Sequence, residues 1–357
     1  MKLRDLTADF VKTLEPYASP GDSTDATKIW LNANEYPTAT KFEARFETLN
    51  RYPEVQPGEV IRRYAEYAGV KSSQVLVTRG ADEAIELLIR TFCTPFKDRV
   101  IYPAPTYSMY SISARTCAVN VTELPSKENL LLDVEGLRSE LKQSDKNTKI
   151  VFLCRPNNPT GEVVKKAAVE KLLKAAKNSL VVIDEAYIEF CPQESVADLL
   201  TVYPNLVIVR TLSKAFALAG LRCGMILADS EIIESVKKVM APYPVPTPVA
   251  VIAERSLSDG GIAAMRQRVE VIKRNRDYLT GELKRLKGVR KVYPSETNFV
   301  LFDVDNASLI FQKLWTKGIA LRKPADSDNT LRVSVGTIDE CRAFIFKLTG
   351  LLKEAQL

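Results

Sequence analysis

Lys214 is the residue of this sequence whose surroundings best suit covalent chemistry. It lies in residues 211–224, between hydroxyl-bearing and small apolar side chains. A lysine amine forms a Schiff base with an aldehyde only when it is partly deprotonated, and a desolvated position beside other cations lowers its pKa toward that state. Arg222, eight residues further on, is such a cation and a candidate phosphate ligand. Taken alone, the segment favours a surface lysine that begins an amphipathic helix, so the rest of the chain must decide.

Three further motifs carry polar groups directly after apolar runs. Gly80 leads from the first run into a helical pattern, whose unpaired N–H groups would suit a phosphate, although its acidic residues alone favour ordinary capping. The turn at residues 157–161 offers asparagine amides as donors to a ligand oxygen. The run at residues 180–184 ends in Asp184. This carboxylate must have a partner in the protein or be held ready to bind a ligand, because an unpartnered buried charge is costly.

Alternating apolar runs and helical patterns indicate the elements that must position these motifs. The runs of Val, Ile and Leu lie at residues 74–78, 98–102, 149–154, 180–184, 206–211 and 224–228. Such runs, with helices between them, predict a parallel or mixed sheet covered on both faces. Open sheets of this kind bind ligands at the carboxyl ends of their strands, where the motifs recur in order.

The last third of the chain has a different pattern. Proline-rich residues 241–248 end the alternation and lead into a long, charged helical stretch over about 249–286. Strands at 291–293, 298–302 and 331–335, a helix at 307–317 and a final helix from about 339 are expected to follow. We therefore expect a large domain at residues 41–245 and a small C-terminal α+β domain at 246–357, with residues 1–40 packing against the small domain.

Composition narrows the classes of function. The chain has 357 residues, 46% of them apolar, and its longest apolar runs fall well short of a membrane span. The charged N-terminus is unlike a signal peptide, and the six cysteines form no CxxC pair, so we expect a cytoplasmic protein without a metal site. A net charge of +6, spread without a basic block, makes nucleic acid an unsuitable partner. The absence of histidine excludes Ser-His-Asp and Cys-His catalysis and the HExxH zinc motif.

The four motifs together resemble those of fold-type I, pyridoxal-phosphate-dependent aminotransferases, and within that group the histidinol-phosphate aminotransferase family. The resemblance extends from Leu14-Glu-Pro-Tyr17 to Leu331-Arg-Val-Ser-Val-Gly336 and is nearly continuous between Asn50 and Gly224. It implies an α/β fold, in which a large domain with a mostly parallel, helix-covered sheet binds pyridoxal 5′-phosphate beside a smaller α+β domain. It also implies a homodimer that interconverts L-histidinol phosphate and 2-oxoglutarate with imidazole acetol phosphate and L-glutamate, in histidine biosynthesis.

The resemblance also implies a role for individual residues around the cofactor ring. Lys214 would form the Schiff base with the cofactor and, in a chain without histidine, would be the natural base. Asp184 would pair with the pyridine nitrogen, which strengthens the cofactor's electron sink. Asn158 and Tyr187 would bind the phenolate oxygen, and Tyr107 would stack on the ring face. Lys214, Asp184 and Tyr187 are thus the implied catalytic residues.

The resemblance assigns two further groups of residues. The cofactor phosphate would be held by the backbone of Ala81 and Asp82, by Ser213 and Arg222, and by Tyr52 from the other subunit of the dimer. The substrate would be bound by Tyr17, Asn34, Arg322 and Arg332. By pattern alone, Arg332 alternates with apolar neighbours on a strand and faces solvent. The sequence leaves open whether Arg155, just before the asparagine turn, touches the cofactor or faces solvent.

Several alternative functions keep the same cofactor residues. An aminotransferase for aromatic amino acids is the nearest, and a fold-type I decarboxylase of a phosphorylated amino acid is more distant. Lyase and transferase differ mainly in which bond of the substrate α-carbon lies perpendicular to the cofactor ring, so these motifs do not separate them. A pyridoxal-phosphate-binding regulatory module without turnover is the alternative that is not an enzyme.

Overall fold

A seven-stranded sheet forms the centre of the molecule. The computed structural model describes residues 6–15, 28–43, 46, 48–143, 147–324 and 328–354. The sheet has the order β2–β8–β7–β6–β5–β3–β4, and β8 runs antiparallel to both of its neighbours while the other strands share one direction. Its strands are β2 (Val75–Thr78), β3 (Arg99–Pro103), β4 (Asn120–Leu124), β5 (Thr148–Cys154), β6 (Leu180–Asp184), β7 (Leu206–Thr211) and β8 (Gly224–Ala228). The predicted α/β fold with a mostly parallel sheet is confirmed.

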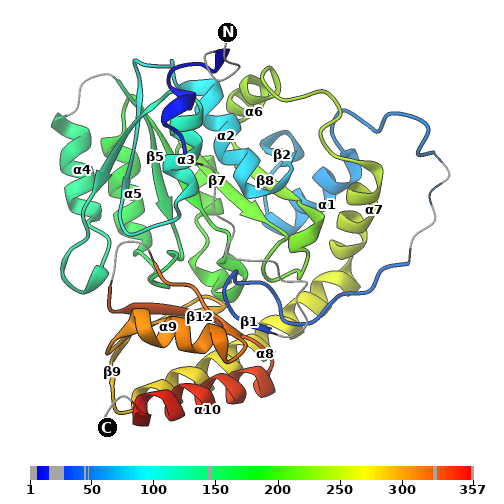
Figure 1. Ribbon diagram of the computed structural model, residues 1–357. Helices are drawn as coiled ribbons and strands as arrows, with labels where there is room; N and C mark the ends of the chain where they lie inside the picture. Colours follow the sequence, from blue (N-terminus) through cyan, green and yellow to red (C-terminus); the bar gives the residue numbers. More distant parts are fainter. Residues whose placement is uncertain are drawn as a thin grey trace.

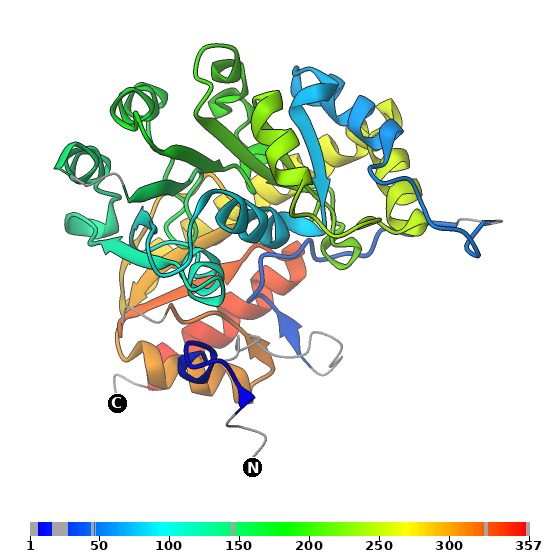
Figure 2. The same cartoon turned by 90° about the horizontal axis from the view of Figure 1, so that it is seen from above.

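Helices cover both faces of this sheet (Figures 1 and 2). Along β5, Val151 and Leu153 belong to one apolar core, whereas Ile150 and Phe152 belong to a second, because successive side chains of a strand point to opposite faces. The first core includes side chains of α1 (Gly58–Ala68), α4 (Val134–Gln143), α5 (Lys166–Ala175) and α7 (Thr247–Ser256). The second includes side chains of α2 (Gly80–Phe92), α3 (Met109–Thr116) and α6 (Ser230–Lys237). Burial on both faces explains why the strands appear in the sequence as continuous apolar runs.

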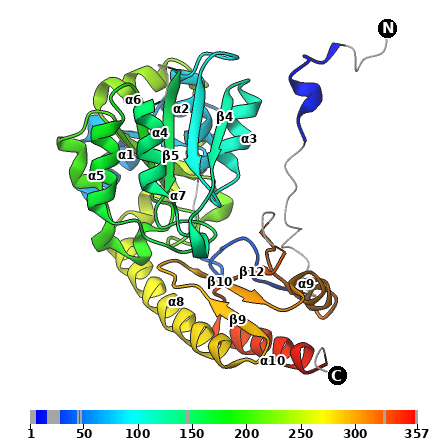
Figure 3. The same ribbon diagram turned by 90° about the vertical axis from the view of Figure 1, so that its left-hand side faces the viewer.

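A three-stranded antiparallel sheet and its helices lie at one end of the large sheet (Figure 3). The strand order is β12–β10–β9, and a separate two-stranded pair joins β1 to β11 in parallel. Figure 3 shows α8 running from the large sheet along the small one, with α10 beside it. The elements are β1 (Ile29–Trp30), α8 (Asp259–Arg285), β9 (Val289–Val292), β10 (Phe299–Val304), α9 (Ala307–Thr316), β11 (Ile319–Ala320), β12 (Thr330–Ser334) and α10 (Ile338–Glu354). The limits of the three predicted domains stay a prediction.

Two of the differences from the sequence prediction have a local physical reason. The helical stretch expected over 249–286 is two helices, because the Ser258 side chain accepts a hydrogen bond from the Gly261 N–H and begins α8 separately. Strand β4 was not predicted, since Asn120–Leu124 is a partly exposed edge strand without a continuous apolar run. None of the described helices is long and apolar enough to cross a membrane. The cytoplasmic location stays a prediction.

Candidate active site

A cavity of about 520 Å³ lies at the carboxyl ends of the strands that share one direction. Its walls come from the segments that follow β2, β3, β5, β6 and β7, and from residues 32–35, Arg322, Pro324 and Arg332 beside the smaller sheet. The predicted site residues that line it are Asn34, Ala81, Asp82, Tyr107, Asn158, Asp184, Tyr187, Ser213, Lys214, Arg222, Arg322 and Arg332. Tyr17 lies outside the described residues. Tyr52 lies outside the cavity, 81% exposed, with its ring stacked on Tyr243.

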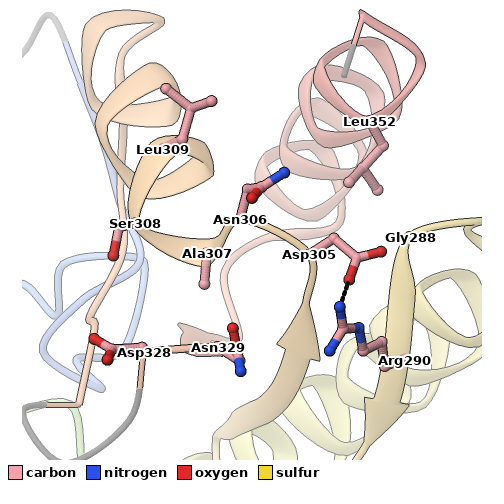
Figure 4. A pocket seen from close by; sticks show the side chains of 10 residues that line it. All are labelled: Gly288, Arg290, Asp305, Asn306, Ala307, Ser308, Leu309, Asp328, Asn329 and Leu352. Atoms are coloured by element: carbon pink, nitrogen blue, oxygen red, sulfur yellow. Dashed lines mark ion pairs between the residues drawn. The ribbon is translucent and has the colours of Figure 1, made fainter. Parts of the chain in front are cut away.

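A second cavity, of about 580 Å³, lies at the N-terminus of α9 and the end of β10 (Figure 4). Arg290 and Asp305 form an ion pair in its wall, as the dashed line in Figure 4 marks. Asn306, Ser308 and Asn329 also line it, but none of the predicted site residues does. The chemistry predicted from the sequence therefore belongs to the first cavity.

Lys214 presents a partly buried amine to the first cavity. Its Nζ donates a hydrogen bond to the carbonyl oxygen of Ala33 at 2.9 Å. Burial, and then the positive charge of Arg332, lower the pKa of Lys214 to about 8, although Glu35 and Asp82 oppose the shift. A useful fraction of this amine is therefore neutral near pH 7, as a Schiff-base lysine requires.

Asp184 is a buried carboxylate with two protein donors. Tyr110 Oη donates to Oδ2 at 2.7 Å, and the Ala186 N–H donates to Oδ1 at 3.0 Å. Burial raises the pKa of Asp184 to about 6, while both hydrogen bonds act in the opposite direction. A cation placed at its free lone pairs would favour the charged form. The carboxylate is thus suited to hold a protonated ring nitrogen.

A phosphate-sized cradle lies at the N-terminus of α2. Gly80 has a φ of 82°, and a Cβ atom there would lie 2.6 Å from Nη2 of Arg222. The Arg222 guanidinium therefore lies directly over the first turn of the helix, where it pairs with Asp82 at 3.2 Å. Tyr107 Oη donates to the other carboxylate oxygen of Asp82 at 2.8 Å. Backbone N–H groups, a guanidinium and the nearby Ser213 hydroxyl are the donors that bind phosphate in proteins.

Hydrogen bonds across the cavity fix the direction of two polar side chains. Arg332 Nη1 donates to Asn158 Oδ1 at 2.5 Å, so the amide NH2 of Asn158 is left to donate elsewhere. Asn34 Nδ2 donates to Tyr187 Oη at 3.0 Å, so the Tyr187 hydroxyl keeps its own proton to donate. Both groups therefore offer donors to a ligand oxygen.

The expectation that Arg332 faces solvent is wrong. Its side chain is only 7% exposed, and Nη2 donates to the carbonyl oxygen of Asn32 at 2.6 Å. Packing of residues 32–34 over β12 buries a face that alternation alone assigns to water. Arg322 lies beside it, because the main chains of Arg322 and Arg332 exchange hydrogen bonds of 3.1 and 2.8 Å.

Arg155, whose surroundings the sequence left open, reaches neither the cavity nor solvent. Its guanidinium is fully buried, donates to the carbonyl oxygens of Val164 and Glu194, and pairs with the Glu194 carboxylate at 2.6 Å. Arg155 therefore holds Glu194, in the segment that follows Tyr187, on the side away from the cavity. Sequence reasoning missed Tyr110, although its place one helical turn after Tyr107 could have indicated a second aromatic side chain near the cavity.

The donor set of the cavity fits pyridoxal 5′-phosphate. A lysine amine with a lowered pKa, a buried carboxylate, two donors for an oxygen and a phosphate cradle lie around one space of suitable size. The exclusion of a Cβ at Gly80 by Arg222 indicates that the cradle is built for close approach of the backbone to a ligand.

Comparison with known proteins agrees with a site for pyridoxal phosphate. Residues 26–348 match the family described as aminotransferase class I and II. The chain is 50% identical over 347 residues to the histidinol-phosphate aminotransferase of Shigella boydii serotype 18, covering 96% of each chain. The solved structure of the Sinorhizobium meliloti histidinol-phosphate aminotransferase, in complex with pyridoxal-5′-phosphate, is similar with a TM-score of 0.84 at 20% identity, covering 98% of each chain. That of the Clostridium acetobutylicum histidinol-phosphate aminotransferase gives 0.82 at 24% identity, over 91% of this chain and 99% of that one.

Proposed function

Because the chain belongs to the histidinol-phosphate aminotransferase family, within aminotransferase class I and II, we propose that it transfers the amino group of L-histidinol phosphate to 2-oxoglutarate. The products are imidazole acetol phosphate and L-glutamate, and the reaction belongs to histidine biosynthesis. The cofactor is pyridoxal 5′-phosphate. The observation that carries the proposal is a lysine amine with a pKa of about 8 in the same cavity as a buried carboxylate and a phosphate cradle.

Different residues around the cavity would bind different parts of the cofactor. When bound, pyridoxal phosphate supplies an aldehyde for amine exchange and an electron sink for the pair left when the substrate loses its α-proton. Asp184 would hold the pyridine nitrogen in its protonated form. The NH2 of Asn158 and the hydroxyl of Tyr187 would donate to the phenolate oxygen, because their acceptor atoms are already used by Arg332 and Asn34. Tyr107 would lie against the ring face.

The cofactor phosphate would lie in the cradle at the start of α2. The N–H groups of Ala81 and Asp82 are in the first turn, where no carbonyl of the same helix can accept from them. Ser213 would add a hydroxyl, and Arg222 would add a charged donor from the opposite side. Binding would set the dianion against Asp82, whose charge the Arg222 guanidinium already partly balances at 3.2 Å.

Lys214 would be the base as well as the attachment point. Its Nζ would take the α-proton of the substrate and deliver it to carbon C4′ of the cofactor, because this chain has no histidine and the other ionisable side chains that line the cavity are acids or arginines. The positive charge of Arg332 supports this role, since it helps to keep the amine neutral.

Arg322, Arg332 and Asn34 would bind the two substrates in turn. A guanidinium offers a planar pair of donors that fits the phosphate of histidinol phosphate and the carboxylate of glutamate alike. Tyr17, which lies outside the described residues, stays a predicted part of this subsite.

The reaction is tested by mixing purified protein and pyridoxal phosphate with histidinol phosphate, with and without 2-oxoglutarate. Keto product that depends on 2-oxoglutarate, without release of CO2, is expected. Preferred turnover of aromatic amino acids, release of CO2, or cofactor binding without turnover would each favour one of the alternatives. Lys214→Ala should fold but lose the absorbance band of the attached cofactor and turnover, so full turnover in that variant would contradict the assignment.

A homodimer would complete the site. Tyr52 is 81% exposed, and Leu49 and Val55 on the same segment are also exposed, so an apolar surface surrounds it. We place Tyr52 against the cofactor phosphate of the partner subunit. Mixed dimers of Lys214→Ala and Tyr52→Ala contain one intact site each, so random exchange should restore about a quarter of wild-type activity. Mixtures no more active than the separate variants would contradict a shared site.

A further inference from the structure

Tyr110 of α3 contacts Asp184 from the side away from the cavity. Its side chain is fully buried, and its ring stacks on Phe152 of β5 with centroids 4.6 Å apart and an interplanar angle of 2°. Tyr107 packs edge-on against the same ring at 5.9 Å. The Tyr110 ring is therefore held on two sides, which directs its hydroxyl to Asp184 Oδ2 at 2.7 Å.

The hydrogen bonds of Asp184 leave one lone-pair site free on each oxygen. A carboxylate has two oxygens and about four lone-pair sites. Tyr110 and the Ala186 N–H use one site on each oxygen, and both donors are held by buried structure. Asp184 lines the cavity and Tyr110 does not, so the carboxylate connects a buried hydroxyl to the ligand space.

We propose that Tyr110 is a positioning residue, whose hydroxyl fixes the Asp184 carboxylate and favours its charged form, so that it can hold the protonated pyridine nitrogen of the cofactor. The inference rests on the proposed function, because it takes the cofactor nitrogen to lie at Asp184.

The charge balance supports this role. Burial raises the pKa of Asp184 to about 6, and the hydrogen bond from Tyr110 is the largest of the effects that oppose the rise. Burial and the negative charge of Asp184 also raise the pKa of Tyr110 well above its ordinary value, so its hydroxyl remains a donor. Without this hydroxyl, more of Asp184 would be protonated at neutral pH, and a neutral acid holds a pyridinium poorly.

The test compares Tyr110→Phe with a matched control, Tyr293→Phe. The Tyr293 hydroxyl also donates to an aspartate, Asp303 Oδ2 at 2.9 Å, but on the smaller sheet and away from the cavity. Each apoprotein is titrated with pyridoxal phosphate labelled with 15N in the ring, and the 15N chemical shift and cofactor Kd are measured. Tyr110→Phe should weaken cofactor binding by roughly tenfold, as expected for a hydrogen bond to a charged group, and shift the nitrogen toward its unprotonated value. It should lower kcat with little change in KM, while Tyr293→Phe matches wild type.

Asp184→Asn distinguishes the role of Asp184 at the cofactor nitrogen from the role of Tyr110 behind it. It should shift the nitrogen strongly, and adding Tyr110→Phe to it should then have no further effect on the shift. If Asp184→Asn shifts the nitrogen and Tyr110→Phe does not, Tyr110 only packs and the inference is overturned while the proposed function stands. If neither shifts it, the assignment of Asp184 fails, and the inference fails with it.

A second variant covers the case in which Tyr110→Phe does not fold. 3-Fluorotyrosine at position 110 keeps the ring and hydroxyl but makes the hydroxyl a stronger donor. Cofactor binding severalfold tighter than wild type would support the positioning role, and an unchanged Kd would overturn it.

Discussion

Replacing Gly80 by alanine tests whether Arg222 and the backbone of α2 form one phosphate cradle. The added Cβ would lie 2.6 Å from Arg222 Nη2 and 3.1 Å from Cζ. Ordinary contact begins at 3.4 Å, so the guanidinium must move away by roughly 0.8 Å or more. The end of an arginine side chain can do so cheaply, so the clash itself is expected to impair ligand binding rather than folding.

The magnitude follows from two separate effects. A residue with a Cβ at a φ of 82° costs about 1–2 kcal/mol relative to glycine, and this strain lowers the free energy of unfolding. Loss of a well-aimed charged hydrogen bond to phosphate costs about 1.5–3 kcal/mol, which corresponds to a roughly 10- to 150-fold larger Kd for the cofactor. Gly80→Ala should show both effects.

Gly69→Ala provides the matched control. Gly69 ends α1 with a φ of 70°, and a Cβ there would meet no atom within 4 Å. It should therefore show the strain, as a similar fall in the free energy of unfolding, but bind the cofactor like wild type. Kd is measured by titrating apoprotein with pyridoxal phosphate, and stability by urea unfolding without the cofactor. Wild-type Kd in a folded Gly80→Ala variant would refute the cradle.

Three further outcomes are expected. The rate at which apoprotein attaches pyridoxal phosphate should rise about tenfold per pH unit below pH 8 and level off above it, because neutral Lys214 is the reacting form and its pKa is lowered to about 8. Arg332→Gln should move this midpoint to higher pH, since it removes a positive charge that disfavours the protonated amine, and a midpoint that stays in place in stopped-flow measurements would contradict this. Arg155→Met should lower the free energy of unfolding by about 2–4 kcal/mol, because the buried carbonyl groups of Val164 and Glu194 lose their donor. Lys166→Met, which breaks the exposed pair with Asp198, should change it by less than about 1 kcal/mol. Equal losses for the two variants in urea unfolding would show that burial of the Arg155 network adds nothing to stability.

Local patterns in the sequence determined most strands of the large sheet and indicated the candidate site residues. The runs at 180–184, 206–211 and 224–228 are strands with the predicted limits, because a strand buried on both faces must be apolar throughout. Gly80, the asparagine turn, Asp184 and Lys214 were predicted from their joint occurrence after successive apolar runs, because single motifs such as those of Gly80 and Lys214 favoured an ordinary structural role. Even the break between α7 and α8 has a local signal, since Ser258 before Asp259 is a good N-cap.

Only the tertiary structure decided how these residues act on one another. Arg332, 174 residues away in sequence, orients the Asn158 amide by donating to its oxygen. Asn34, 153 residues away, donates to the Tyr187 hydroxyl and so leaves its proton available for donation. Arg332 and Arg155 are buried by segments that no local pattern connects to them. The pKa of Lys214 depends on its burial and on Arg332, and that of Asp184 on its burial and on Tyr110. The sequence gives the residue types, whereas desolvation and charge act through space, so the lowered pKa of Lys214 arises only when the chain has folded around it.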